Sequence, residues 1–207
     1  MLATPEAVAE AAAGAIVATL RSGGTFALAG GSTPRACYER LSADSLPWGR
    51  VVVLFGDERC VAPEDAESNF RMAREALLDR VAPLTVHRMP GELGPEAAAA
   101  LYSAVVDSLR PLDLVLLGVG EDGHTASLFP GHPEVGARGS AVGVRAAPKP
   151  PADRVSLTLE VLREARRVLV LATGAGKRDA VARARRGEVP SGMIPHAEWL
   201  IDQAAAG

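Results

Sequence analysis

The 207-residue sequence predicts an α/β fold with a mainly parallel central sheet, and three observations support this fold class. Short apolar runs alternate with stretches of helical periodicity along the chain. The runs 51–55, 112–118 and 167–173 are apolar at nearly every position, which is typical of parallel strands that are covered on both faces. Glycine-containing segments follow these runs, as expected where ligands bind beyond the carboxyl ends of the strands.

The first half of the chain follows this alternation from its start. The N-terminal stretch carries Glu6 and Glu10 among alanines, and it is interpreted as an amphipathic helix and not as a secretory signal. Ser68 is placed to cap a helix, and Pro95 suits the first turn of another. The predicted elements are an N-terminal helix, a strand at 26–30, a helix at 34–41, a strand at 51–55, a helix at 69–80, a weak strand at 86–89 and a helix from 95 to about 110.

The second half contains the clearest central strands, LDLVLLG (112–118) and RVLVLAT (167–173). Their apolar residues predict burial on both faces. No repeat or interdomain linker interrupts the pattern, so we expect a single domain spanning residues 1–207. The weaker predicted elements are strands at 141–146 and 155–159, a helix at 177–186 and a final segment, 197–205, that fits either a strand or a helix.

Composition restricts the possible classes of function. The formal net charge is −3, so the chain lacks the basic surface that nucleic-acid binding requires. No apolar run is long enough to span a membrane. The two cysteines, Cys37 and Cys60, are not at the spacing of metal ligands. We therefore expect a protein that binds no nucleic acid, no membrane and no metal. Without a secretory signal, reduced cysteines in the cytoplasm are the default expectation. The sequence leaves the oligomeric state open, and a monomer is the default.

The turn after the strand at 26–30 has the layout of an anion site. Gly30 and Gly31 let the backbone approach a ligand, and Ser32 or Thr33 is placed to cap the helix that follows. Unpaired amides and hydroxyls at the positive end of a helix dipole favour phosphate. The same pattern fits an ordinary capped turn, and the Walker A spacing is absent.

The segment TGAGKRDAV (173–181) repeats this layout after another central strand. Lys177 begins its helix, where a positive charge opposes the helix dipole unless an anion lies between them. Lysine is rare in this chain: of 22 basic residues only Lys149 and Lys177 are lysines, which favours a specific role for each. Two turns of this kind can be explained equally well in two ways. Either both bind phosphate, or both are ordinary capped turns.

Three charged residues, Asp57, Glu58 and Arg59, follow the strand at 51–55. Charges at the end of a strand belong either to a solvated edge or to a site, and the sequence alone favours the solvated edge. A site is the alternative, because this strand end is predicted to face the same crevice as the two turns.

The glycines of GVGEDGH (118–124) match the G-x-G-x-x-G pattern of a dinucleotide-binding turn. That turn needs a helix running on from its third glycine and an acidic residue about 20 residues later. Here Pro130 and Gly131 end any helix after about two turns, and no acid lies at 138–146. A nicotinamide site is therefore disfavoured.

The same loop could instead present His124 for proton transfer near neutral pH. Asp122, or one acid of the pair Asp57 and Glu58, could orient the imidazole. A histidine packed under its own loop is the other interpretation, and for a lone histidine it is the commoner one.

Taken together, these loops resemble the bacterial-type 6-phosphogluconolactonase family, which is related to glucosamine-6-phosphate deaminase/isomerase. The resemblance implies a modified Rossmann-like, three-layer α/β sandwich of the sugar-phosphate isomerase type, without a cofactor. It also implies hydrolysis of a small-molecule partner, 6-phospho-D-glucono-1,5-lactone, to 6-phospho-D-gluconate in the oxidative pentose-phosphate pathway. The matching stretches occur in the family's order over roughly residues 5–204, and they are LAGGSTPRACYERL, FGDERCVAPEDAESNFRMA, LLGVGEDGHTASLFPG, PKPPADRVSLTLEVL and LVLATGAGKRDAV.

The resemblance further implies roles for individual residues. His124 would be the general base that activates water for attack on the lactone carbonyl, and Asp122 or Asp57 would orient it or tune its pKa. Arg59 and Arg154 would bind the phosphate or polarise the developing oxyanion. The positions that match phosphate handling are Gly30, Gly31, Ser32, Thr33 and Lys177, with Lys149 adding charge and Asn69 matching the family's S-N-aromatic signature.

Two other functions stay open on the sequence. An amino-sugar-6-phosphate deaminase/isomerase shares the phosphate turn and the DGH loop, but its ring-opening chemistry usually has an acidic N-E-P-type segment where this chain reads ASLFPG. A non-catalytic sugar-phosphate sensor on the same fold would not need Asp122 and His124. No DNA-binding helix-turn-helix precedes residue 25, which also disfavours the sensor.

Overall fold

The central sheet is parallel throughout, and the predicted fold class is confirmed. The computed structural model describes residues 1–207. Every neighbouring pair of the six strands is parallel. Across the sheet the strands are, in order, β4 (Thr85–Val86), β2 (Val51–Phe55), β1 (Gly24–Leu28), β5 (Leu114–Gly118), β8 (Val168–Ala172) and β9 (Glu198–Ile201).

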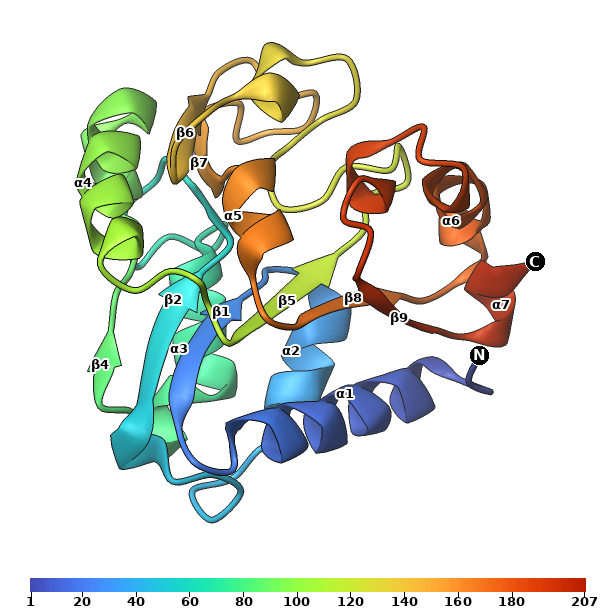
Figure 1. Ribbon diagram of the computed structural model, residues 1–207, viewed down its shortest axis with the longest axis horizontal. Coiled ribbons are helices and arrows are strands. Elements are labelled where there is room, and N and C mark those ends of the chain that lie inside the picture. Colours follow the sequence, from blue (N-terminus) through green and yellow to red (C-terminus); the bar gives the residue numbers. More distant parts are fainter.

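Helices cover both faces of this sheet, which makes three layers (Figure 1). Crossovers between parallel strands are right-handed, so the direction in which the chain moves along the sheet decides which face a helix covers. The chain moves in one direction from β1 to β4 and in the opposite direction from β5 to β9, and its helices therefore lie on opposite faces. One face carries α1 (Pro5–Leu20), α2 (Ser32–Tyr38) and α3 (Asn69–Ala76), and the other carries α4 (Pro95–Asp107), α5 (Leu159–Glu164) and α6 (Arg178–Arg185), with α7 (Gln203–Ala206) ending the chain.

A second, antiparallel sheet is the main departure from the prediction. It consists of β3 (Asp57–Arg59), β7 (Arg154–Leu157) and β6 (Ala141–Val144), paired in that order. The sequence predicts strands close to β6 and β7, but neither their separate sheet nor β3, because three consecutive charged residues have low strand propensity. The short helix α5 is also absent from the prediction.

The helix that follows the turn of Gly30 and Gly31 is capped by a different residue from the one predicted. α2 begins at Ser32, and its N-cap is Gly31, whose φ of 102° favours glycine. Neither Ser32 nor Thr33 caps the helix with its hydroxyl, so the expectation of a hydroxyl cap is wrong. The turn at Gly31 places both residues inside the first helical turn, where their hydroxyls can make other contacts.

The other predicted elements are present with shifted ends. Ser68 caps α3, as predicted, by accepting a hydrogen bond of 3.1 Å from a backbone amide in the first turn, but the α-helix ends at Ala76. The ambiguous segment 197–205 divides into β9 and α7, with Asp202 as the cap between them. The strand expected at 86–89 is confined to the two residues of β4.

The apolar core has two parts. A cluster of 49 buried residues fills the space between the central sheet and its helices. A separate cluster contains only Phe129, Val144 and Ala147, which lie on β6 and in the loops next to it. No helix is both long enough and apolar enough to cross a bilayer.

Candidate functional site

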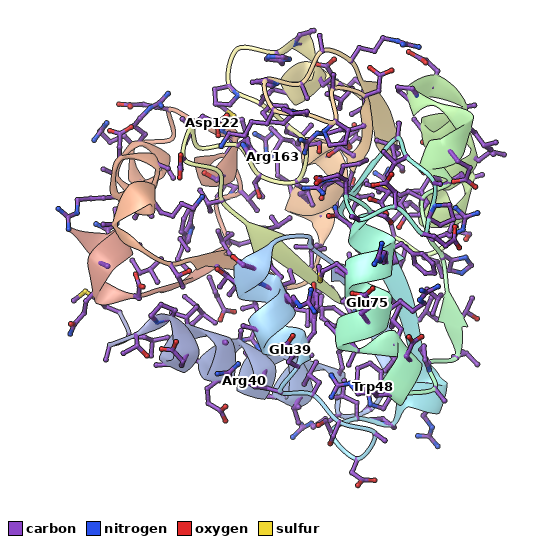
Figure 2. All side chains as sticks on the ribbon, turned by 180° about the vertical axis from the view of Figure 1, so that it is seen from behind. Glu39, Arg40, Trp48, Glu75, Asp122 and Arg163 are labelled. Carbon is purple, nitrogen blue, oxygen red and sulfur yellow. The ribbon has the colours of Figure 1, made fainter.

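A crevice opens where the strand order of the central sheet reverses. β1 and β5 are neighbours, but the chain leaves β1 toward β2 and β5 toward β8, which is the switch point where open α/β sheets bind ligands. The loops after β1, β2, β5 and β8 meet there around a space of about 220 Å³, so their predicted convergence is confirmed. Figure 2 shows Asp122 at this end of the molecule and Trp48, which precedes β2, at the opposite end.

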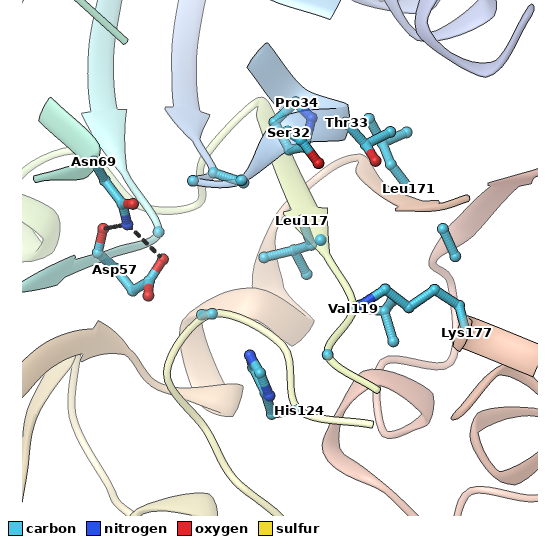
Figure 3. A pocket seen from close by; sticks show the side chains of 18 of the residues that line it. Ser32, Thr33, Pro34, Asp57, Asn69, Leu117, Val119, His124, Leu171 and Lys177 are labelled. Atoms are coloured by element: carbon cyan, nitrogen blue, oxygen red, sulfur yellow. Dashed lines mark hydrogen bonds between the residues drawn. The ribbon is translucent and has the colours of Figure 1, made fainter. Parts of the chain in front are cut away.

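The crevice brings together all but one of the predicted site residues. Figure 3 shows five of them, Ser32, Thr33, Asp57, His124 and Lys177. The exception, Asp122, does not line the crevice but contacts His124, which does. The predicted residues in the lining are Gly30, Gly31, Ser32, Thr33, Asp57, Arg59, His124, Lys149, Arg154 and Lys177.

His124 is held from behind by Asp122. Its Nδ1 lies 2.6 Å from Asp122 Oδ1, and its backbone amide donates to the same oxygen at 3.1 Å. A carboxylate next to Nδ1 favours the tautomer with the proton on that nitrogen, which leaves Nε2 free to accept one. Burial raises the pKa of Asp122, but the hydrogen bond and charge of His124 outweigh burial and set it at about 2. Of the acids proposed to orient His124, Asp122 is therefore the one in contact with it.

Two glycines of the 118–124 loop stand where a side chain would not fit, and one of them borders this pair. A methyl group at Gly120 would overlap His124 Nδ1 and Asp122 Oδ1, and one at Gly123, whose φ is 91°, would overlap Val189. No α-helix follows the loop before β6. The loop thus lacks the helix of a dinucleotide-binding turn, and Gly120 makes room for the Asp122–His124 pair while Gly123 allows close packing against Val189.

Asp57 lies elsewhere in the crevice wall and does not contact His124 (Figure 3). Its Oδ2 accepts a hydrogen bond of 2.6 Å from Ser127 Oγ, and its backbone carbonyl accepts one of 2.9 Å from Asn69 Nδ2. Asn69 also packs against the first glycine turn, because a methyl group at Gly30 would overlap its amide. Asn69 therefore links the Asp57 strand end to the Gly30 turn.

Arg59 and Arg154 lie directly opposite each other in the register of β3 and β7. Like charges in this position repel, so an anion between them would be stabilising. Burial lowers the pKa of Arg154, and the charge of Asp57 opposes this effect. Arg154 donates from Nε to the Pro151 carbonyl at 3.0 Å and from Nη2 to the Lys149 carbonyl at 2.9 Å, whereas the buried Arg59 Nε has no partner.

The two predicted anion turns meet across the crevice. The hydroxyls of Thr33 and Thr173 are 2.8 Å apart. Gly174 donates its amide to both carboxylate oxygens of Asp202 at 3.1 and 3.0 Å, which shapes the turn that leads to Lys177. Sequence reasoning missed this role of Asp202, because nothing near it along the chain indicates a contact with residue 174.

The interpretation of residues 57–59 as a solvated edge is wrong for the two acids. Asp57 and Glu58 are only 7% and 4% exposed. Glu58 accepts hydrogen bonds from the amides of Arg59, Asn69 and Phe70 at 2.7–2.8 Å, and from Ser68 Oγ at 2.9 Å. Burial raises the pKa of Glu58 against the effect of these bonds. Glu58 thus anchors the start of α3, which carries Asn69 into the crevice.

Comparison with known proteins gives a consistent result. The family model described as glucosamine-6-phosphate isomerases/6-phosphogluconolactonase matches residues 3–203. A 6-phosphogluconolactonase of Streptomyces coelicolor is 37% identical over 97% of this chain and 90% of its own length, and one of Synechocystis sp. is 39% identical over 89% and 84%. The structure of 6-phosphogluconolactonase from Trypanosoma brucei superposes with a TM-score of 0.87 at 29% identity, covering 100% of this chain and 96% of that one.

Proposed function

The chain belongs to the glucosamine-6-phosphate isomerase/6-phosphogluconolactonase family, and from this premise we propose that it hydrolyses 6-phospho-D-glucono-1,5-lactone to 6-phospho-D-gluconate. The observation that carries the proposal is one crevice containing a carboxylate-held imidazole and two turns suited to an anion. A phosphorylated lactone presents a carbonyl for the first feature and a dianion for the second.

In the proposed reaction His124 Nε2 removes a proton from a water molecule, whose oxygen attacks the lactone carbonyl carbon. Asp122 stabilises the imidazolium that forms. The tetrahedral intermediate collapses by breaking the ring C–O bond, and the imidazolium returns its proton to the departing oxygen. General base catalysis of this kind contributes roughly 10²- to 10⁴-fold to the rate.

The phosphate is proposed to bind at the turn of Gly30, Gly31, Ser32 and Thr33, opposite Lys177. This assignment is supported by the unpaired amides expected in the first turn of a helix and by an ammonium with no ion-pair partner. Arg59, Arg154 and Lys149 are proposed to add positive charge on the second-sheet side, where the developing oxyanion would lie. Asp57 is proposed to keep the buried Arg154 positively charged, because its carboxylate raises the pKa of that arginine.

An assay on freshly prepared lactone, with the spontaneous rate subtracted, tests this function. We expect saturable hydrolysis. Release of ammonia from glucosamine 6-phosphate would favour the deaminase instead. Tight binding of 6-phosphogluconate without turnover of either compound would favour a sensor.

The proposal extends to a monomer in the cytoplasm that acts on a small molecule. Light scattering that gives the mass of a dimer would contradict the monomer, and fractionation of the source cells would test the compartment.

A further inference from the structure

Phe129 contacts two charged or titratable groups of the site at once. Its ring centroid lies 4.6 Å from that of His124, with 46° between the planes. The guanidinium carbon of Arg154 lies 5.5 Å from the same ring centroid. Phe129 itself is only 1% exposed. One aromatic ring therefore lies against both the proposed base and an arginine of the second sheet.

The main core does not account for Phe129. Its cluster contains only two other buried residues, Val144 and Ala147, and is separate from the 49-residue core. A phenylalanine with few apolar neighbours is less firmly oriented by packing alone than one in a large core. The other groups against Phe129 include the imidazole of His124, the guanidinium of Arg154 and, at a centroid distance of 5.6 Å, the imidazole of His132.

Arg154 is suited to fix the ring. Its Nε and Nη2 are held by the carbonyls of Pro151 and Lys149, so the plane of the guanidinium is determined by two hydrogen bonds. A planar guanidinium fixed in this way stacks on an aromatic ring as an ammonium cannot. The position of Phe129 is thereby tied to the loop that carries Lys149.

We propose that Phe129 is a positioning residue that holds the His124 imidazole toward the crevice, and that Arg154 acts on the imidazole through Phe129. The proposal rests on the proposed role of His124 as general base. Asp122 holds one edge of the imidazole at Nδ1, which is the only hydrogen bond of the ring, and a single hydrogen bond does not by itself fix rotation of the ring about that contact. The face of Phe129 limits the pivot, and a misplacement of about 1 Å at a reacting group can cost about 10²-fold in rate.

The first test compares Phe129→Leu with Phe26→Leu. Phe26 is fully buried in the main core and serves as the matched control. We expect Phe129→Leu to lower kcat about 10- to 100-fold with KM within about twofold of wild type, and Phe26→Leu to lower thermal stability while keeping kcat. A kcat loss below about fivefold in Phe129→Leu, or an equal loss in both variants, overturns the proposal.

The second test uses Arg154→Lys, which keeps the positive charge and removes the planar guanidinium that lies over the Phe129 ring. NMR of the free protein should show a shift of the His124 imidazole resonances, although Arg154 makes no direct hydrogen bond to His124. Because Arg154 is also proposed to stabilise the oxyanion directly, the kcat loss caused by Arg154→Lys should become smaller in the Phe129→Leu background without disappearing. Unchanged His124 resonances, or the same kcat loss in both backgrounds, overturns the proposal.

The kinetic test and the NMR test together distinguish a failure of this inference from a failure of the proposed function. If the wild-type protein does not hydrolyse the lactone, the proposed function fails, and the NMR measurement still decides whether Arg154 moves His124. If Phe129→Leu does not fold, the same measurement on Arg154→Lys decides the positioning role alone.

Discussion

β1 and β5 are neighbours in the sheet, and the turn after each of them is rich in glycine, but the glycines have different roles in the two turns. The first leads directly into α2, and Gly31 uses a positive φ to begin that helix. The second leads into no helix, and Gly120 is small because the Asp122–His124 pair occupies the space next to it. Glycine content shows only that the backbone must bend or approach closely. The element that follows decides between an anion site and a presented side chain.

This difference implies different kinetic signatures. Contacts at the first turn and at Lys177 are proposed to hold a phosphate that does not change during the reaction, so their loss should raise KM. Contacts at the second turn involve a proton in transfer, so their loss should lower kcat.

The largest expected effect comes from His124→Ala. We expect kcat to fall by roughly 10² to 10⁴, because the general base is lost, while 6-phosphogluconate still binds. Steady-state kinetics and calorimetric titration of the product measure the two quantities. Unaffected turnover would show that the base is another group.

Gly120→Ala tests whether the second turn is built around the Asp122–His124 pair. The added methyl group should displace the pair and lower kcat by about tenfold or more. Gly136→Ala is the matched control, because a methyl group there meets no atom within 4 Å. Equal kcat in the two variants would mean that the close fit at Gly120 has no part in catalysis.

Lys177→Ala tests the anion side of the comparison. Losing a charged phosphate contact should raise KM about tenfold, which corresponds to about 1.4 kcal/mol, and leave kcat within about twofold. Lys177→Arg should recover part of the loss by keeping the charge. A normal KM in Lys177→Ala would place the phosphate elsewhere.

The smallest effect concerns acid stability. The pKa of Asp122 is lowered from 3.8 to about 2 in the folded protein. A lowered pKa means that the stability contributed by Asp122 is fully present above pH 3.8 and is lost as the pH falls through 2. The difference in melting temperature between wild type and Asp122→Asn should therefore shrink from pH 5 to pH 2. Because the carboxylate is 37% exposed, its contribution should stay below about 1 kcal/mol. If the difference in melting temperature stays constant from pH 5 to pH 2, the pKa of Asp122 is not lowered in the folded protein.

Much of the fold and site was predictable from the chain itself. The runs of β2, β5 and β8 are apolar enough to indicate buried parallel strands, and such strands end at a common edge. Loops far apart in sequence, such as those containing Gly30 and Lys177, could therefore be assigned to one crevice. The sequence also showed that the loop at 118–124 is not a dinucleotide-binding turn, because Pro130 prevents the helix that such a turn requires.

Apolar periodicity and turn chemistry are local properties, and they were enough to predict the parallel sheet and the set of loops that meet. Only the tertiary structure decided which acid contacts His124, that charged residues 57–59 form a strand, that Arg59 faces Arg154, and that Phe129 lies between His124 and Arg154. These facts depend on register and on packing between residues up to 99 positions apart (Asp57 pairs with Ser156), which no local pattern encodes.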